Sequence, residues 1–243
     1  MGDAGWEREA ENWIRWARTP GHDAYWYYRD AFFDAIVPHG GGRALEVGCG
    51  EGRVARDLCT HGHRVTGLDA SPTLVRAARE ADPEGGYLVG DATELPFPDR
   101  TFDMVVAYNS LMDVHDMPSA VREASRVLKR DGCFCICVTH PINDAGRFCS
   151  SEPDATFVIE DAYLEERRKF EGTYQRDGLT MTFRGWSYSL EAYARALEAA
   201  GFVIECLREP AASERSVATF GRSEIRLQRI PLFLHIRARH HSA

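Results

Sequence analysis

The stretch that decides the fold is Leu45-Glu46-Val47-Gly48-Cys49-Gly50-Glu51-Gly52-Arg53. It joins residues 43–47, which have the apolar pattern of a short buried strand, to residues 52–60, which we expect to be helical. A glycine loop between a strand and a helix is a typical site for a nucleotide-like ligand. Its glycines let the backbone approach the ligand, and the helix N-terminus offers free N–H groups.

The spacing and charge of this loop indicate which ligand it takes. The spacing is GxGxG, whereas dinucleotide sites use GxGxxG. Glu46 stands two positions before Gly48, where a carboxylate would repel a pyrophosphate. It would suit a ligand that carries an ammonium group and a sulfonium charge, which describes S-adenosylmethionine (SAM). We therefore predict that Glu46, Gly48, Cys49 and Gly50 bind this cofactor.

The sequence around the loop alternates between strands and helices. Further strands are expected at 64–69, 86–90, 102–108 and 132–139, and further helices at 71–80 and 118–129. Ser71 and Pro72 form a helix start, as N-cap and first helical residue. This rhythm predicts an α/β fold with a doubly wound, mostly parallel sheet that is covered on both faces.

Two more acids stand where the second and third strands end. Asp69, followed by Ala70, could accept both ribose hydroxyls, and Asp91, followed by Ala92, could accept from an adenine amino group. The carboxyl ends of parallel strands meet along one crevice, so we expect these acids to line up with Glu46. The local alternatives are that Asp69 caps the region of Ser71 and that Asp91 starts a turn.

Segments on either side of this core are expected to cover the site. In residues 1–38, three tryptophans and then a helix at 23–36, begun by Asp23, form an aromatic N-terminal lid. Tyr25 and Tyr28 share one face of that helix and could attract a sulfonium, or they could simply pack the core. Residues 39–243 form the SAM-binding domain, in which about 142–188 are an insertion over the substrate.

The end of the chain predicts one more helix and two more strands. Ser189 is the expected N-cap of a helix that runs to Ala200. Strands are expected at 202–207 and 226–236, paired as an antiparallel edge.

Several of these segments resemble one family in sequence and in order. LEVGCGEG, GLDAS, GDATELPFPDRTFDMVV and REASRVLKRDG resemble the successive motifs of the class I SAM-dependent methyltransferases, in the UbiE-like small-molecule branch. YSLEAYARALEAAGFVIECLREP resembles the last helix–strand unit of that branch. The resemblance departs at Lys129-Arg130-Asp131-Gly132, where the family usually has Pro-Gly.

The resemblance implies a fold and a placement of the cofactor. It implies a Rossmann-like, seven-stranded sheet whose last strand is antiparallel. Glu46 and the glycines would lie at the methionine part of SAM, Asp69 at the ribose and Asp91 with Ala92 at the adenine. Asn109, after the fourth strand, matches a position that often faces the cofactor.

Two histidines are candidates for a catalytic base. His140 follows the fifth strand, and an unperturbed imidazole titrates near ~6.5, which suits proton transfer. The alternative is that His140 anchors its loop beside Pro141. His115 follows the fourth strand between Asp113 and Asp116, either of which could orient it, or it lies on the surface.

The amino-acid composition limits the partners and the location that we expect for this protein. The net charge of −8 disfavours a nucleic-acid substrate, although Arg222, Arg226, Arg229, Arg237 and Arg239 cluster near the end of the chain. We expect neither a membrane span nor a signal peptide. Seven cysteines without a disulfide pattern favour the cytoplasm, and the alternating Cys133, Cys135 and Cys137 are expected to be core thiols rather than metal ligands. The oligomeric state stays open.

Three functions therefore remain at the level of sequence. The first is methyl transfer from SAM to the oxygen, nitrogen or carbon of a small metabolite. The second is a non-catalytic module that binds SAM. The third is an NAD(P)-linked oxidoreductase, which would require the GxGxxG spacing that this loop does not have.

Overall fold

The structure is a computed structural model that describes residues 5–160, 162–164, 167–212, 214, 218, 219, 226 and 228–241. Within these residues, no helix is both long and apolar enough to cross a membrane.

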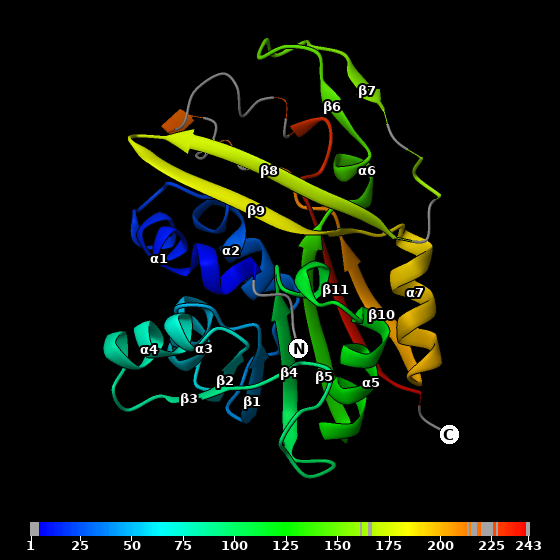
Figure 1. Cartoon of the computed structure of the whole chain (residues 1–243). Helices are drawn as coiled ribbons and strands as arrows, with labels where there is room; N and C mark the ends of the chain where they lie inside the picture. The colour runs from blue at the N-terminus through cyan, green and yellow to red at the C-terminus, as the bar shows by residue number, and fades with distance from the viewer. Residues whose placement is uncertain are drawn as a thin grey trace.

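A seven-stranded sheet forms the centre of the molecule (Figure 1). Its strand order is β10-β11-β5-β4-β1-β2-β3, and β11 runs antiparallel to both of its neighbours. The fold class and the antiparallel last strand are thus as predicted. The strands are β1 Arg43–Val47, β2 Arg64–Asp69, β3 Gly86–Val89, β4 Phe102–Tyr108, β5 Leu128–Thr139, β10 Phe202–Arg208 and β11 Phe233–His240.

Helices cover both faces of this sheet because successive strand residues point to opposite sides. On one face, Phe134 and Ile136 pack with helices α5 Met117–Val127 and α7 Leu190–Ala199. The other face packs against α2 Tyr25–Ala35 and α3 Arg53–Thr60, and α4 Pro72–Ala81 lies next to α3. The predicted caps hold: the hydroxyls of Ser71 and Ser189 accept from the backbone N–H groups of Leu74 and Ala192.

The three alternating cysteines confirm the face that the sequence predicted. Cys133, Cys135 and Cys137 are all buried in the core cluster that includes Phe32 of α2. The Sγ atoms of Cys133 and Cys135 lie 3.8 Å apart.

Two predicted element boundaries were wrong. The last strand begins at Phe233 rather than at residue 226, because Pro231 has no N–H to donate to a sheet ladder. Helix α2 has Ala24 as its N-cap, and Asp23 lies one residue earlier, where its carboxylate accepts from the Tyr25 N–H. Arg222 of the predicted arginine cluster lies outside the described residues.

The segment after β5 contains structure that the sequence did not predict. It starts with α6 Pro141–Asp144 and the short pair β6 Gly146–Phe148 and β7 Phe157–Ile159. A long ribbon follows, in which β8 Arg168–Arg176 pairs with β9 Leu179–Ser187. Asp177 and Gly178 form its turn with positive φ angles of 48° and 78°, which Asp-Gly favours.

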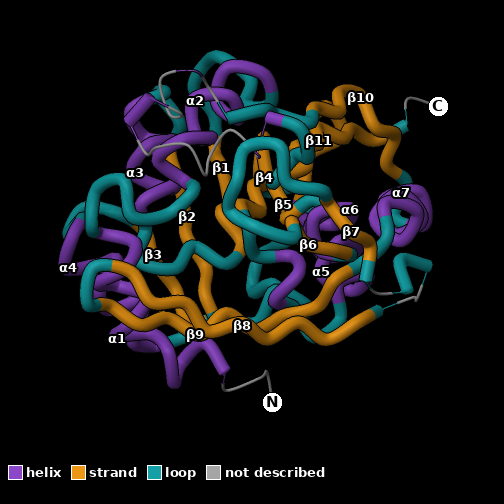
Figure 2. Tube along the Cα trace, turned by 90° about the horizontal axis from the view of Figure 1, so that it is seen from above, coloured by secondary structure: helices purple, strands orange, loops and turns teal. Residues whose placement is uncertain are grey.

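This ribbon and the N-terminal helix α1 Gly5–Arg18 lie together above the sheet. Figure 1 shows the ribbon extended over α1 and α2, and Figure 2 shows β8 and β9 side by side, running from α1 towards α7. A short 3-10 helix, η1 Leu111–Asp113, follows β4 beneath the ribbon.

Candidate functional site

A cavity of about 1210 Å³ lies where β1, β2 and β4 end, beneath α1 and the ribbon. It brings together most of the residues that the sequence selected. Its lining includes Tyr25, Glu46, Gly48, Cys49, Gly50, Asp69, Ala70, Asp91, Ala92, Asn109 and His115. It does not include Tyr28 or His140.

The glycine loop has a backbone that only small residues tolerate. Gly48 and Gly50 have φ angles of +74° and +54°. A Cβ atom on Gly48 would lie 2.3 Å from the Cβ of Ser110, whose hydroxyl donates to the Val47 carbonyl at 2.6 Å. The loop is therefore held closely against the segment after β4, with its exposed side towards the cavity.

Glu46 carries a carboxylate oxygen that has no hydrogen-bond partner among the described residues. The residue is 1% exposed, and within the described chain its Oε2 makes no hydrogen bond. Burial, followed by the charges of Asp69 and Glu51, raises its pKa well above the ordinary value. A buried, unpaired carboxylate is costly unless a cation or a donor meets it. The site therefore fits a ligand with an ammonium group at this point.

Asp69 links the glycine loop to the end of β2. Its Oδ2 accepts from the Gly50 N–H at 2.8 Å, and its Oδ1 accepts from the Ser71 N–H at 2.9 Å. The predicted local role beside Ser71 is therefore present. A carboxylate has about four acceptor sites, so both oxygens can still accept from a ribose. Burial raises the pKa of Asp69.

Asp91 and Asn109 border the cavity from the next two loops. Asp91 is exposed, and its Oδ1 accepts from the Thr93 N–H at 2.8 Å and the Thr93 hydroxyl at 2.7 Å. This is the turn that the sequence left as an alternative, and both of its contacts are made by Oδ1. Asn109 has a φ of 51°, and the Cys137 thiol donates to its Oδ1 at 3.3 Å.

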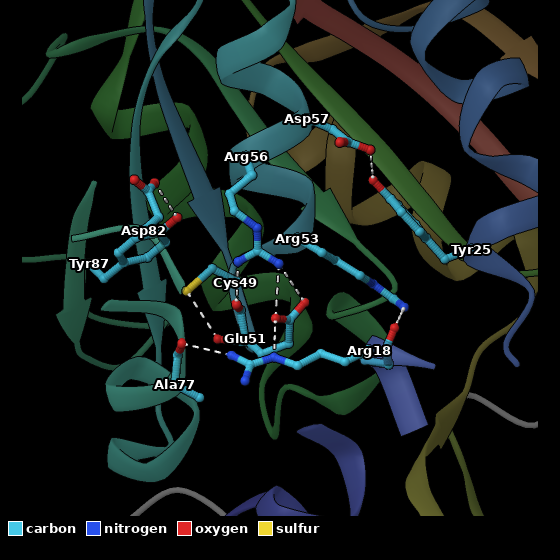
Figure 3. A network of polar contacts seen from close by, with 12 residues as sticks. Arg18, Tyr25, Cys49, Glu51, Arg53, Arg56, Asp57, Ala77, Asp82 and Tyr87 are labelled. Carbon is cyan, nitrogen blue, oxygen red and sulfur yellow. Dashed lines mark hydrogen bonds and ion pairs between the residues drawn. The ribbon is translucent and has the colours of Figure 1, made fainter. Parts of the chain in front are cut away.

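Glu51 ties the glycine loop to α1. The residue is 2% exposed, and its carboxylate accepts from Arg56 at 2.9 Å and from Arg18 at 3.1 Å (Figure 3). Arg18 also donates to the Ala77 carbonyl of α4 at 2.9 Å. One buried carboxylate thus joins α1, α3 and the loop that we expect to bind the cofactor.

Arg53 is a cavity residue whose environment the sequence did not indicate. Its guanidinium lies 4.3 Å from the ring centre of Tyr25 and 5.0 Å from that of Trp13, and it pairs with Asp23 at 2.7 Å. The Tyr25 hydroxyl donates to Asp57 at 2.5 Å. Tyr25 therefore holds Arg53 as well as lining the cavity.

Two selected residues lie elsewhere. Tyr28 is 1% exposed and packs against Phe233 with ring centres 5.1 Å apart, so it belongs to the core. His140 is 3% exposed; its Nδ1 accepts from the Ile142 N–H at 3.1 Å and its Nε2 lies 2.8 Å from Glu209. With both nitrogens engaged, His140 caps α6 and anchors the loop.

His115 stands at the edge of the cavity. It is exposed, and its carbonyl accepts from Arg167 at 2.6 Å. That guanidinium lies 3.8 Å from the ring centre of Trp186 on β9. His115 therefore lies at the edge of the cavity beside Trp186 of the insertion, without a hydrogen bond from its side chain to another side chain of the described residues.

Aromatic contacts attach α1 to the ribbon. Phe183 of β9 makes edge-on contacts with Trp6, Trp13 and Trp16 at 6.5, 6.1 and 6.0 Å between ring centres. Arg184, the next residue, pairs with Glu9 of α1 at 3.3 Å. The three tryptophans do share one helical face, as the sequence predicted.

Comparison with known proteins agrees with this geometry. Residues 45–136 match the family described as "Methyltransferase domain". The chain is 29% identical over 182 residues to aklanonic acid methyltransferase DauC from Streptomyces sp. (strain C5), covering 70% of this chain and 78% of that protein. It is 34% identical over 125 residues to a demethylmenaquinone methyltransferase of Thermotoga maritima, covering 51% of this chain and 54% of that protein.

A solved structure agrees as well. A SAM-dependent methyltransferase from Mesorhizobium loti superposes with a TM-score of 0.70 at 27% identity, over 90% of this chain and 98% of that one.

Fold, glycine loop and relatives together define the class: the chain is a class I SAM-dependent methyltransferase. Within that class it belongs to the UbiE-like branch. The methyl donor of this family is SAM. Of the three functions that the sequence left open, methyl transfer from SAM is therefore the one that the fold and the relatives support.

Proposed function

We propose that the enzyme transfers the methyl group of SAM to a small, partly aromatic molecule bound in the same cavity. The observation that carries this proposal is the continuity of the cavity. From the acids at the strand ends it extends to aromatic side chains of the insertion, namely Phe148, Phe157, Phe170 and Trp186. Aromatic walls bury planar apolar ligands well, as small-molecule pockets usually do.

The cofactor would occupy the end formed by the strand tips. Glu46 would meet the ammonium group, the glycines the methionine backbone, Asp69 the ribose, and Asp91 with Ala92 the adenine. The geometry supports this order because Gly50 donates to Asp69, which places the methionine and ribose positions side by side. SAM supplies a positively charged sulfonium methyl group, and the raised pKa values of Glu46 and Asp69 fit a site that awaits a cation.

The N-terminal segment 1–38 and the insertion at about 142–188 would act together as the cover of this site. Helix α1 is attached to the glycine loop through Arg18 and Glu51, and to the ribbon through Phe183. Keeping water from the sulfonium favours transfer to the acceptor over hydrolysis. Neither His140 nor Tyr28 has a part in this proposal.

The names of relatives support a small-molecule acceptor. They include the aklanonic acid and demethylmenaquinone methyltransferases described above. The seven free thiols of the chain, four of them in one core cluster, support work in the cytoplasm.

A turnover assay tests the proposal. The full chain is incubated with SAM and a panel of quinols, phenols and aromatic amines, and formation of S-adenosylhomocysteine (SAH) and methylated products is followed by mass spectrometry. We expect acceptor-dependent SAH that Asp69→Asn reduces at least tenfold and Asp103→Asn, at the opposite end of the sheet, leaves unchanged. SAM binding without SAH formation on any acceptor would contradict the proposal.

A further inference from the structure

One carboxyl group at the acceptor end of the cavity has no part in the cofactor site described above. Asp113 ends η1, the short helix after β4, lines the cavity and is only partly exposed. Because β4 and β2 are parallel strands of one sheet, η1 stands at the same edge as Asp69. Asp113 is therefore placed between the predicted cofactor position and the aromatic insertion.

The ribbon closes directly over this carboxyl group. A Cβ atom on Gly185 of β9 would lie 2.6 Å from Asp113 Oδ1 and 3.0 Å from the Met112 carbonyl. Any side chain at Gly185 would push the carboxyl group away. The glycine thus lets β9 lie directly over Asp113.

A second acid on the same side of β9 differs in its bonding. Asp144 Oδ2 accepts from the Thr139 hydroxyl at 2.7 Å, and Asp144 also meets Ser187 and the charge of Arg168. Ser187 is two residues beyond Gly185, so both acids approach one face of the strand. Asp144 is already supplied with donors.

Asp113 lacks such a set of partners. In the described part of the chain, no ion pair joins it to a cation. The Trp6 side chain makes a hydrogen bond to its carboxyl group, and its charge interacts with Asp69 and Tyr193. Arg184, beside Gly185, pairs with Glu9 at 3.3 Å and Glu171 at 3.2 Å instead. Burial and then the charge of Asp69 raise the pKa of Asp113 well above its ordinary value.

We propose, resting on the methyl transfer proposed above, that Asp113 contacts the methyl acceptor and takes the proton of its O–H or N–H nucleophile. The acceptor is then a neutral hydroxyl or amine compound rather than a carboxylate. The lone pair of the oxygen or nitrogen forms the bond to the methyl carbon, and the carbon–sulfur bond leaves its electron pair on sulfur. The proton of the nucleophile passes to the Asp113 carboxylate.

The charges of this step balance inside the cavity. Before transfer, a sulfonium faces a carboxylate; afterwards, a thioether faces a carboxylic acid. No net charge is created where the dielectric is low, which keeps the electrostatic cost of the step small. The sulfonium also lowers the pKa of Asp113 beforehand, so that the group is ionised when the acceptor arrives.

A carboxylate acceptor fits this end of the cavity poorly. It would place a third anion beside Asp113 and Asp69. The cavity arginines at this end already have acceptors: Arg147 pairs with Glu160 at 2.8 Å, and Arg226 donates to the Ser150 carbonyl at 2.7 Å.

A matched pair of ligands tests the acceptor class without turnover. The full chain is saturated with SAH, and the binding of 2-naphthol and of 2-naphthoate is measured by calorimetry at neutral pH. We expect 2-naphthol to bind at least tenfold more tightly. Asp113→Asn should reduce this ratio to threefold or less, whereas Asp131→Asn, an equal change of charge on the exposed surface outside the cavity, should preserve it.

Three outcomes would overturn the proposal. They are equal or tighter binding of 2-naphthoate, a ratio of the two affinities that Asp113→Asn leaves unchanged, and no binding of either ligand. The initial SAH titration shows separately whether the cofactor site works.

A kinetic experiment tests the same residue. With an acceptor found in the turnover assay, Asp113→Asn should lower kcat by about 10²–10⁴-fold, the usual contribution of a general base. Asp113→Glu should restore part of the rate, and the rise of kcat with pH should disappear in Asp113→Asn. An unchanged kcat would likewise overturn it.

Discussion

The indole Nε1 of Trp13 lies 3.3 Å from the point that a Cβ atom on Gly50 would occupy. The N-terminal helix therefore rests directly on the glycine loop. Trp13 also contacts Phe183 of the ribbon, so one side chain joins the cofactor end of the cavity to its cover.

This contact predicts that Trp13→Ala weakens cofactor binding. Removing the indole uncovers the glycine loop and frees the Arg53 guanidinium that lies against it. We expect the Kd for SAH to rise roughly tenfold, equal to about 1.4 kcal/mol, in a calorimetric titration. Trp26→Ala removes an indole that does not line the cavity and should change this Kd less than threefold. Equal effects of the two substitutions would show that Trp13 acts through general stability alone.

The glycine loop predicts a difference between two substitutions. Gly48 and Gly62 both have positive φ angles, +74° and +90°, so alanine is strained at either position. A Cβ on Gly48 would also meet Ser110, whereas nothing lies within 4 Å of one on Gly62. We expect Gly48→Ala to lower the free energy of unfolding by at least about 2 kcal/mol more than Gly62→Ala in urea titrations. Similar losses would mean that the close contact with Ser110 is relaxed at little cost.

We predict that replacing Glu46 has opposite effects on the stability of the free protein and on cofactor binding. Its folded pKa is raised, so the folded protein holds a proton that the unfolded chain releases above about 4.3. The free energy of unfolding therefore falls as the pH rises from that value towards the folded pKa. At pH 8, Glu46→Gln should raise the stability of the free protein by about 1 kcal/mol or more and weaken SAM binding at least tenfold. A variant that loses both stability and affinity would contradict this account of the unpaired oxygen.

We predict a second pH dependence of the free energy of unfolding at His235, with the opposite sign to that at Glu46. It is fully buried beside Phe32 and Phe233, and burial lowers its pKa to about 4. Between about 6.5 and 4, the unfolded chain binds a proton that the folded chain does not. This group therefore removes up to roughly 3 kcal/mol of stability as the pH falls through that range.

Replacing the imidazole should remove this loss. We expect His235→Phe to be more stable than the native chain at pH 4.5 and to gain less at pH 8, in thermal unfolding at both values. His241→Gln, at an exposed histidine, is the control and should show no such difference. A gain that does not depend on pH would mean that His235 is protonated in the folded state.

Local patterns in the sequence were enough to predict the sheet and most of the residues that line one side of the cavity. The strands are short apolar runs, and the acids follow them directly, so the topology of a parallel sheet brings Glu46, Asp69 and Asp91 to one edge. The positions of these acids depend only on the order of the strands and helices and on their alternation along the chain, and both can be read from the sequence.

What the sequence did not predict depends on contacts between distant segments. Tyr28 and Tyr25 share a helical face, but Tyr28 packs against Phe233, which lies far along the chain. His140 has the position of a base, and Glu209, far along the chain, engages its second nitrogen. The ribbon strand β8 is mostly exposed and polar, so it lacks the alternation that identifies a half-buried strand. Asp113 acquires its surroundings only when Gly185 packs over it.

The most direct test of the central claim is a crystal structure of the full chain with SAH. We predict the ammonium group against Glu46 Oε2, the ribose hydroxyls on Asp69 and the adenine beside Asp91 and Ala92, with Trp13 covering the glycine loop. SAH bound with its ribose away from Asp69, or bound outside this cavity, would contradict the account.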